Sequence, residues 1–232
     1  MKQALILITL LSLMSLGGFS LAQDMSADEV VANLEAAAES LEDAQLTLTG
    51  SLIDPDGSEI ALEIFLQIIP ETKASRAEFF QPDALADNFI VLDGDAVYNY
   101  VFLTNQVTIF PTDDPDALGG LFPDGNVDQG FDFTFNPEQL FRGWTSSLEG
   151  YSESPVGNIY EMRFFNEEEA AIVAYVDATI VDGAWYPYTM TFYTQDDEVL
   201  ADITLEDFVR DQGLDPGEVT YIPDDAEVID ER

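Results

Sequence analysis

The chain has 232 residues, with 46 acidic side chains against 7 basic ones and a formal net charge of −39. A surface of this sign cannot neutralise phosphates, which excludes nucleic-acid binding and disfavours charge-driven docking to anionic lipid. The chain also lacks cysteine and histidine, which excludes disulfides, zinc sites built from those residues, and Ser-His-Asp or Cys-His catalytic centres. The acidity serves either solubility or the docking of a basic partner, and the sequence leaves both open.

Residues 1–22 have the pattern of a secretory signal peptide. Lys2 is followed by an apolar run that is short for a membrane span, and residues 20–22 supply a small-x-small cleavage site. We therefore expect cleavage near Ala22 and export, most simply into a bacterial periplasm, with an uncleaved anchor as the alternative. Residues 23–232 are then expected to form a single domain with one core.

The mature chain begins with a predicted amphipathic helix over residues 26–43. Ser26 and Glu29 have capping-box spacing, and Val30 and Leu34 begin an apolar stripe of helical period. Alternating apolar and polar residues follow almost without interruption, which predicts β-strands. These strands are expected over residues 45–53, 59–69 and 73–80, and then within the segment 88–111.

The segment 88–111 predicts a meander of three antiparallel strands, with one tight turn at residues 93–94 and a second one further on. In the middle strand Tyr98, Tyr100 and Phe102 recur with a period of two, so they are expected to line one face. A soluble sheet with a row of large aromatic side chains must either cover that face or use it.

Residues 112–150 break the alternation, with several prolines and Asp-rich turns, and are expected to form a lid or loop insertion. An Asn-Pro start and an apolar stripe predict an amphipathic helix over residues 137–148 within it. The side chains on that stripe include Leu140, Phe141 and Trp144.

Strands resume in the last third of the chain, where Tyr186, Tyr188, Met190 and Phe192 form a second aromatic row. The expected strands cover residues 158–165, 170–181, 185–194 and 199–206. The predicted fold is mainly β (α+β): about ten antiparallel strands in sequential order, curved into a half-open barrel with an N-terminal helix and a helical lid.

Acidic residues supply two weak chemical signals. The alternating acidic and amide side chains of Asp124–Asp132 are similar to a calcium loop, but the turn glycine is displaced and Phe135 occupies the position of the bidentate glutamate. A solvated acidic loop is the better interpretation. A carboxylate pair of glycosidase type stays possible, although pairs are expected by chance among so many acids. We therefore expect no metal, no cofactor and no enzymatic activity.

The aromatic rows have two interpretations. An ordinary barrel core filled by its own side chains is the more frequent arrangement. A ligand cavity is favoured by the size of the sheet and by soft apolar residues such as Met162 and Met190. Composition alone leaves both open.

The order and spacing of these segments resemble the outer-membrane lipoprotein carrier (LolA) and lipoprotein-sorting family over nearly the whole mature chain. Residues 90–100, Ile-Val-Leu-Asp-Gly-Asp-Ala-Val-Tyr-Asn-Tyr, are similar to the family's succession of strand, Asp-Gly and aromatic strand. Residues 106–108 follow at the family's usual distance. The tail over residues 217–230 resembles the family's ending, an aromatic strand, a proline turn and a short Val-Ile strand.

The resemblance implies an open half-barrel whose concave apolar face, capped by helices, holds acyl chains. Family members often carry an arginine before a proline that ends an early strand, and this arginine ties down the lid. Here Ile69 precedes Pro70, and Arg76 matches only a looser basic position, which puts lid control in doubt. The acyl-chain cavity would be lined by Leu62, Ile64, Leu66, Phe89, Val91, Tyr98, Tyr100, Phe102, Met162, Phe164, Tyr188, Met190 and Phe192, and the lid would contain Leu140, Phe141 and Trp144.

The implied function is that of a monomeric periplasmic carrier that shields the acyl chains of lipoproteins during transport to the outer membrane. Its expected partners are acylated lipoproteins or lipid, with an inner-membrane release transporter and an outer-membrane acceptor. The alternative is a periplasmic regulator of the same fold that senses lipid or lipoprotein, which would usually need a second domain. A hydrolase that uses carboxylates is the third and weakest hypothesis.

Overall fold

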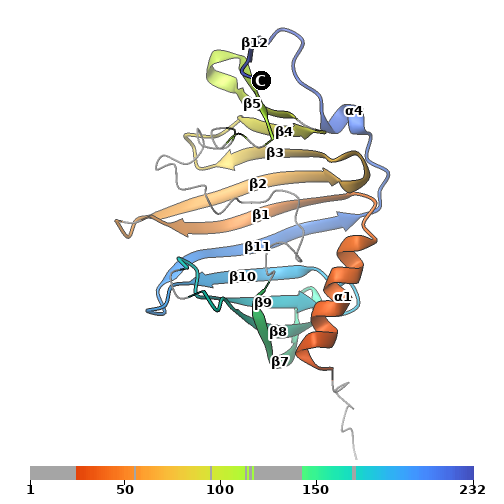
Figure 1. The fold of residues 1–232 in the computed structure, drawn as a ribbon, viewed down its shortest axis with the longest axis vertical. Helices are drawn as coiled ribbons and strands as arrows, with labels where there is room; N and C mark the ends of the chain where they lie inside the picture. The colour runs from red at the N-terminus through yellow and green to blue at the C-terminus, as the bar shows by residue number, and fades with distance from the viewer. Residues whose placement is uncertain are drawn as a thin grey trace, which may run out of the picture.

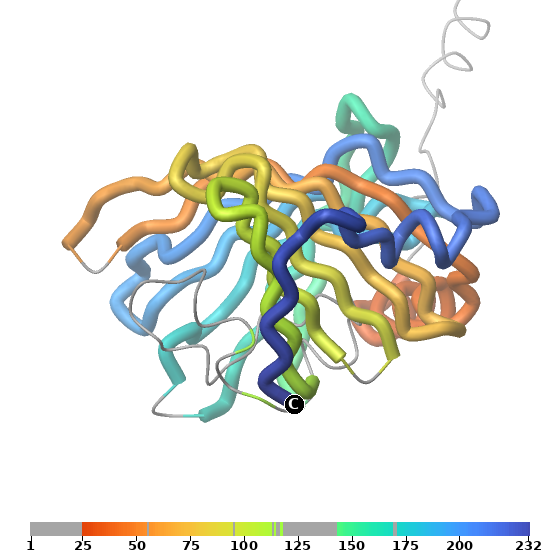
Figure 2. The backbone as a smooth tube through the Cα atoms, turned by 90° about the horizontal axis from the view of Figure 1, so that it is seen from above, coloured from red at the N-terminus to blue at the C-terminus, as the bar shows by residue number. Residues whose placement is uncertain are grey.

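The computed structural model describes residues 25–54, 56–94, 96–112, 114, 117, 143–168 and 171–232. These residues form one strongly curved sheet of twelve strands (Figures 1 and 2). The first half contains α1 (Ala27–Glu39), β1 (Ala44–Ile53), β2 (Glu59–Ile69), η1 (Pro70–Thr72), β3 (Ala74–Gln81), β4 (Phe89–Asp93), β5 (Ala96–Val101), η2 (Phe102–Thr104) and β6 (Gln106–Pro111). The second half contains β7 (Thr145–Ser154), β8 (Gly157–Phe165), β9 (Tyr175–Val181), β10 (Pro187–Tyr193), β11 (Val199–Arg210), α4 (Pro216–Val219) and β12 (Glu227–Asp230).

The strand order is β12-β6-β5-β4-β3-β2-β1-β11-β10-β9-β8-β7. Two meanders, β1 to β6 and β7 to β11, are therefore joined by the antiparallel pairing of β1 with β11. The predicted sequential order holds inside each meander but is wrong between β6 and β7, which lie far apart in the sheet. The described residues alone form twelve strands, against the expected ten or so, and β12 pairs parallel to β6.

Helix α1 begins as the sequence predicts. Ser26 and Glu29 form a reciprocal capping box, in which the Glu29 carboxylate accepts from the Ser26 amide at 2.8 Å. The helix ends at Glu39, earlier than predicted. Its buried residues Val30 and Leu34 pack into the largest hydrophobic cluster of the sheet. We call the sheet face under α1 the concave face, and Figure 2 shows α1 lying inside the arch of the strands.

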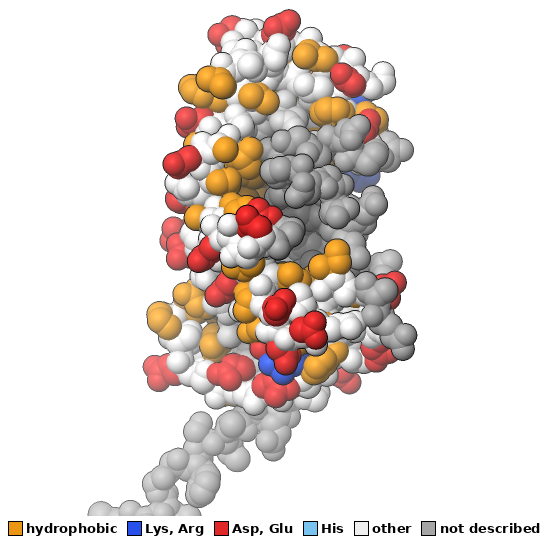
Figure 3. Space-filling model, turned by 90° about the vertical axis from the view of Figure 1, so that its left-hand side faces the viewer, with side chains coloured by type: hydrophobic (Ala, Val, Ile, Leu, Met, Phe, Trp, Pro, Cys, Tyr) orange, Lys and Arg blue, Asp and Glu red, His pale blue; other side chains and the backbone are white. Residues whose placement is uncertain are grey.

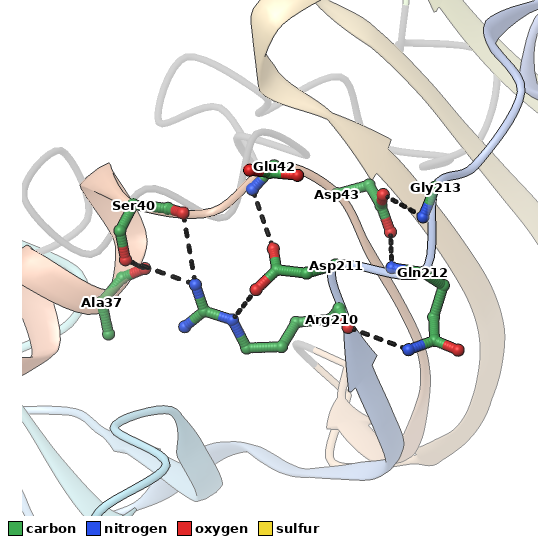
Figure 4. A network of polar contacts seen from close by, with 8 residues as sticks. All are labelled: Ala37, Ser40, Glu42, Asp43, Arg210, Asp211, Gln212 and Gly213. Atoms are coloured by element: carbon green, nitrogen blue, oxygen red, sulfur yellow. Dashed lines mark hydrogen bonds and ion pairs between the residues drawn. The ribbon is translucent and has the colours of Figure 1, made fainter.

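A polar network holds the end of α1 against the end of β11 (Figure 4). The buried Asp43 carboxylate accepts from the backbone amides of Gln212, Gly213 and Leu214 at 2.9, 2.7 and 3.2 Å. The Arg210 guanidinium donates to the Ser40 carbonyl at 3.3 Å. The network therefore fixes the position of the C-terminal end of α1 relative to the sheet.

The same network lowers the pKa of the Asp211 carboxyl. The first cause is the hydrogen bond from the Glu42 amide at 3.0 Å, and the second is the hydrogen bond from Arg210 at 2.7 Å.

The predicted lid helix over residues 137–148 is contradicted at its end. Residues from Thr145 onward belong to β7, whose residues Thr145 to Leu148 pair with Phe165 to Met162 of β8. The pairing of β7 with β8 thus overrides the helical pattern. Residues 118–142, which include Leu140, Phe141 and the acidic loop Asp124–Asp132, lie outside the described residues.

The tail also departs from the prediction, because the short helix α4 occupies the place of the expected aromatic strand. The expected short Val-Ile strand is present as β12. The signal-peptide prediction lies outside the residues that the structure describes. No helix within the described ranges has the length and apolar character needed to cross a membrane.

Candidate functional site

The concave face carries a continuous apolar surface that crosses both meanders. Cross-strand partners share a face, so the register gives its members directly. Leu66 lies opposite Leu46 and Ala77, and Ile64 lies opposite Leu48 and Phe79.

Beyond the central pair of strands, the same face continues through the second meander. There the register places Ile203, Met190, Ala178 and Met162 side by side. The neighbouring row is formed by Phe192, Val176 and Phe164. These side chains belong to one hydrophobic cluster, together with α1.

Seven of the predicted cavity residues therefore share the concave face. Five of them are buried and two are half-buried. The buried residues are Ile64, Leu66, Met162, Phe164 and Met190, and the half-buried ones are Leu62 and Phe192. Trp144, predicted for the lid, is also half-buried against this cluster.

Four other predicted cavity residues lie on the opposite, convex face. In the register of β3 with β4, Ala77 pairs with Ile90 and Glu78 pairs with Phe89. It is therefore Ile90 that continues the concave row, while Phe89 points the other way. Val91, Tyr98 and Tyr100 share the face of Phe89, because they are its partners or alternate with it along the strands.

The convex residues form a second cluster with its own cover. Phe89, Val91, Tyr100 and Val107 are buried together, with Tyr98 and two residues of the C-terminal segment, Ile222 and Ala226, packed against them. The rings of Phe89 and Tyr100 stack with centroids 4.4 Å apart. The aromatic row of the middle strand is thus part of a packed cluster and not a wall of the concave face.

Arg76 holds the C-terminal segment on the convex face. Its side chain is buried, lies 3.8 Å above the Phe89 ring centroid, and donates through a terminal nitrogen to the Tyr221 carbonyl at 2.8 Å. It also pairs with Glu78 at 2.6 Å. Ile69, in the position of the family's arginine, is buried with Ala74 and Val219. The basic residue that the resemblance marked therefore fixes the tail.

Two further predicted cavity residues take other positions. Phe102 lies in η2 after the strand has ended and is exposed. Tyr188 is half-buried at an irregularity in the pairing of β10 with β9. The concave residues that the sequence interpretation missed include Ile90, Val97 and Phe110. The sequence shows apolar residues at these positions. Because both faces of β4 and β5 are apolar, the alternation does not indicate which face is the concave one.

Two tyrosines with perturbed pKa values, Tyr160 and Tyr186, lie in or beside the concave cluster. Burial raises the pKa of Tyr160, and the nearby Asp182 carboxylate adds to the effect. Burial likewise raises the pKa of Tyr186, whose ring stacks on Phe208 with centroids 4.3 Å apart. Among the described residues, no group of three or more carboxylates is arranged to hold a metal ion.

Comparisons with known proteins give the fold. No family model matches the chain, and no curated protein sequence matches it. An uncharacterized conserved protein from Thermus thermophilus has a TM-score of 0.60 and 22% identity, over 88% of this chain and 98% of that one. A structure of the Pseudomonas aeruginosa MucA/MucB complex has a TM-score of 0.50 and 14% identity, over 84% of this chain and 60% of that one.

The chain thus spans less than two thirds of the matched chain of that complex. A putative outer membrane lipoprotein-sorting protein domain from Vibrio parahaemolyticus is similar with a TM-score of 0.44 and 11% identity, over 83% of this chain and 95% of that one.

Proposed function

We propose that the chain is a non-enzymatic carrier that shields the acyl chains of lipoproteins on its concave face. The observation that carries this proposal is the continuous apolar surface across both meanders, which includes half-buried large side chains such as Leu62, Trp144 and Phe192. An apolar, curved surface with few polar groups suits a flexible hydrocarbon chain, which offers no hydrogen bonds.

The energetics are sufficient for capture. Burying hydrocarbon contributes about 0.8 kcal/mol per methylene, so a chain of about twelve methylenes would contribute about 10 kcal/mol before ordering costs. Release requires only that the carrier lower the free energy that is gained by burying the acyl chain. A shift of α1 on the concave face would do so.

The proposed setting follows from the same reasoning. Residues 1–22 would direct export, and residues 23–232 would act as a monomer in the periplasm. An inner-membrane transporter would supply the acylated cargo and an outer-membrane acceptor would take it. The resemblance of the sequence to the lipoprotein-sorting family supports this assignment.

A regulator that binds a partner protein is the second candidate. The likeness to a chain of the MucA/MucB complex favours it, because that neighbour is seen bound to another protein. Such a protein would present the concave face or the convex tail to a polypeptide.

Binding of a fluorescent fatty acid tests the carrier proposal on matched variants of the two faces. Leu62→Asn and Phe192→Ser place polar groups on the concave face at half-buried positions. Each is expected to weaken binding, whereas Tyr98→Ser, half-buried on the convex face, leaves it unchanged. Equal losses in all three variants, or no binding by the wild type, would refute the proposal.

A further inference from the structure

The tip of the β5–β6 hairpin presents bulky apolar side chains to solvent. Leu103 is 91% exposed and Phe102 is 57% exposed, and the preceding Val101 is also exposed. A hairpin turn usually carries small or polar residues, because nothing there buries an apolar side chain. Two large apolar residues at this tip therefore need a partner outside the molecule or a specific use.

The tip is held in one conformation by hydrogen bonds. The Phe102 amide donates to the Asn88 side-chain carbonyl at 2.9 Å, and the Asn105 amide donates to the Phe102 carbonyl at 3.1 Å. Asn105 adopts the left-handed conformation, and its side chain joins Tyr100 at 3.0 Å to the Asp225 carbonyl at 3.1 Å. Because the tip is already ordered, burying its apolar residues costs little conformational entropy.

Other exposed apolar side chains lie at the same end of the sheet. Strand direction alternates along an antiparallel sheet, so the β5–β6 turn, the β3–β4 loop, the β8–β9 loop and the β10–β11 loop share one end. Phe80, Phe165, Ile172 and Val199 are all exposed at or beside these connections. Figure 3 looks onto this end and shows hydrophobic side chains exposed between acidic ones.

The hairpin is uncharged although the chain is strongly acidic. Residues 96–112 contain no Asp, Glu, Lys or Arg, in a chain that has 53 such residues from 46 acidic and 7 basic ones. Such a segment can enter a low-dielectric phase without carrying a charge into it. The carboxylates of Asp225 and Glu227 accept hydrogen bonds from the side chains of Asn105 and Gln106, directly beside the tip, and would repel an anionic surface.

We propose that the β5–β6 tip docks the protein on a zwitterionic lipid bilayer by inserting Phe102 and Leu103 into the boundary between headgroups and acyl chains. An amphipathic element inserted at this depth is held by its buried apolar area, and the attraction needs no basic residues. The carboxylates beside the hairpin select against anionic lipid. Docking through the tip would also bring the other exposed apolar side chains at this end of the sheet, such as Phe165 and Ile172, close to the membrane. This proposal does not depend on the carrier function.

Co-sedimentation of the full mature chain with vesicles of phosphatidylcholine and phosphatidylethanolamine tests the proposal. Burying a Leu or Phe side chain changes a partition constant by roughly 10- to 100-fold. The double variant Phe102→Ser/Leu103→Asn is therefore expected to lose at least tenfold in vesicle binding. The matched control Val156→Asn/Val209→Asn removes exposed apolar residues at the opposite end of the sheet and is expected to bind like the wild type.

A spectroscopic variant gives a second readout. Tryptophan fluorescence of Leu103→Trp is expected to shift to shorter wavelength on zwitterionic vesicles and to be quenched by brominated acyl chains, with weaker effects when anionic lipid is added. Fatty-acid binding by Phe102→Ser/Leu103→Asn should be unchanged, which separates this proposal from the carrier function. Wild-type protein that stays in the supernatant, binding that survives the double variant, or stronger binding to anionic vesicles would overturn it.

Discussion

Replacing Arg76 with methionine is expected to release the C-terminal segment from the convex face. The substitution keeps an unbranched apolar stem against Phe89 but removes the hydrogen bond to the Tyr221 carbonyl and the ion pair with Glu78. The Arg76 side chain is buried and donates to the segment at the Tyr221 carbonyl. The segment should therefore loosen while the sheet stays folded.

The magnitude follows from the three contacts. A hydrogen bond from a charged donor contributes about 1.5–3 kcal/mol, and stacking of the guanidinium on the Phe89 ring contributes about 0.5–2 kcal/mol. Glu78 is partly exposed, so its ion pair contributes less than about 1 kcal/mol. Methionine recovers part of the packing, which gives an expected loss of about 2–4 kcal/mol in the local stability of the segment.

Hydrogen exchange measures this loss directly. The Glu227 amide donates to the Asn105 carbonyl and the Glu231 amide donates to the Ile109 carbonyl, both at 2.9 Å. Exchange at these two amides should accelerate by roughly 30- to 1000-fold, because each 1.4 kcal/mol of opening free energy is a factor of ten.

Arg163→Met is the matched control. Arg163 pairs with Asp177 at 2.5 Å and lies 4.6 Å from the Tyr175 ring centroid, within the second meander. Both charged side chains are about one third exposed, so the free energy of unfolding should fall by only about 1 kcal/mol. Exchange of the C-terminal amides should not change. If Arg76→Met also leaves their exchange unchanged, Arg76 does not hold the segment.

Three further predictions concern the frame of the sheet. Asp43→Asn removes the buried carboxylate that accepts from the Gln212 and Gly213 amides and should lower the free energy of unfolding in urea by about 1.5–3 kcal/mol, against little change for the exposed Glu42→Gln; equal effects would contradict the capping role. Gly50→Ala should destabilise by several kcal/mol, on the order of a large core defect, because its Cβ would lie 2.0 Å from the Asp202 carbonyl oxygen at a φ of +146°; a thermal melt like that of the wild type would refute this. The raised pKa of Tyr160 means that folding favours the protonated phenol. The stability that this phenol contributes is therefore complete below its ordinary pKa near 10 and is lost as the pH rises through the raised pKa. Tyr160→Phe should therefore lose less stability than the wild type in urea titrations above that pH, and an identical alkaline decline would contradict the assignment.

Local patterns predicted the elements well. The capping box of Ser26 and Glu29 is formed, and β2 covers Glu59–Ile69 as the alternation indicates. The meander of β4, β5 and β6 lies within the predicted segment 88–111. Each of these features depends on residues that are close together in the chain, so a local sequence pattern is enough to predict it.

The faces of β4 and β5 could not be predicted in the same way. The resemblance places Phe89, Val91, Tyr98 and Tyr100 in the cavity, but the structure places them on the convex face. Both faces of these strands are apolar, since the C-terminal segment covers the outer one. A shift of one residue in register exchanges the faces, and the residues that cover the outer face, Ile222 and Ala226, lie more than a hundred residues away in the chain.

Long-range pairing also explains the errors in topology. The pairing of β1 with β11 closes the sheet between the two meanders, and no local signal in the sequence indicates it. The end of the predicted helix over residues 137–148 became the edge strand β7, because Leu148 pairs with Met162 of β8. Propensity alone does not report such pairing.

In the proposed function, the concave face carries hydrocarbon chains. Native mass spectrometry of the exported protein, isolated without detergent, tests it most directly, with lipid extraction of the same sample to identify any adduct. The wild type is expected to carry a bound acylated or lipidic mass, which is reduced in Leu62→Asn and Phe192→Ser and retained in Tyr98→Ser. Protein that carries no such mass and binds no fluorescent fatty acid would contradict the account.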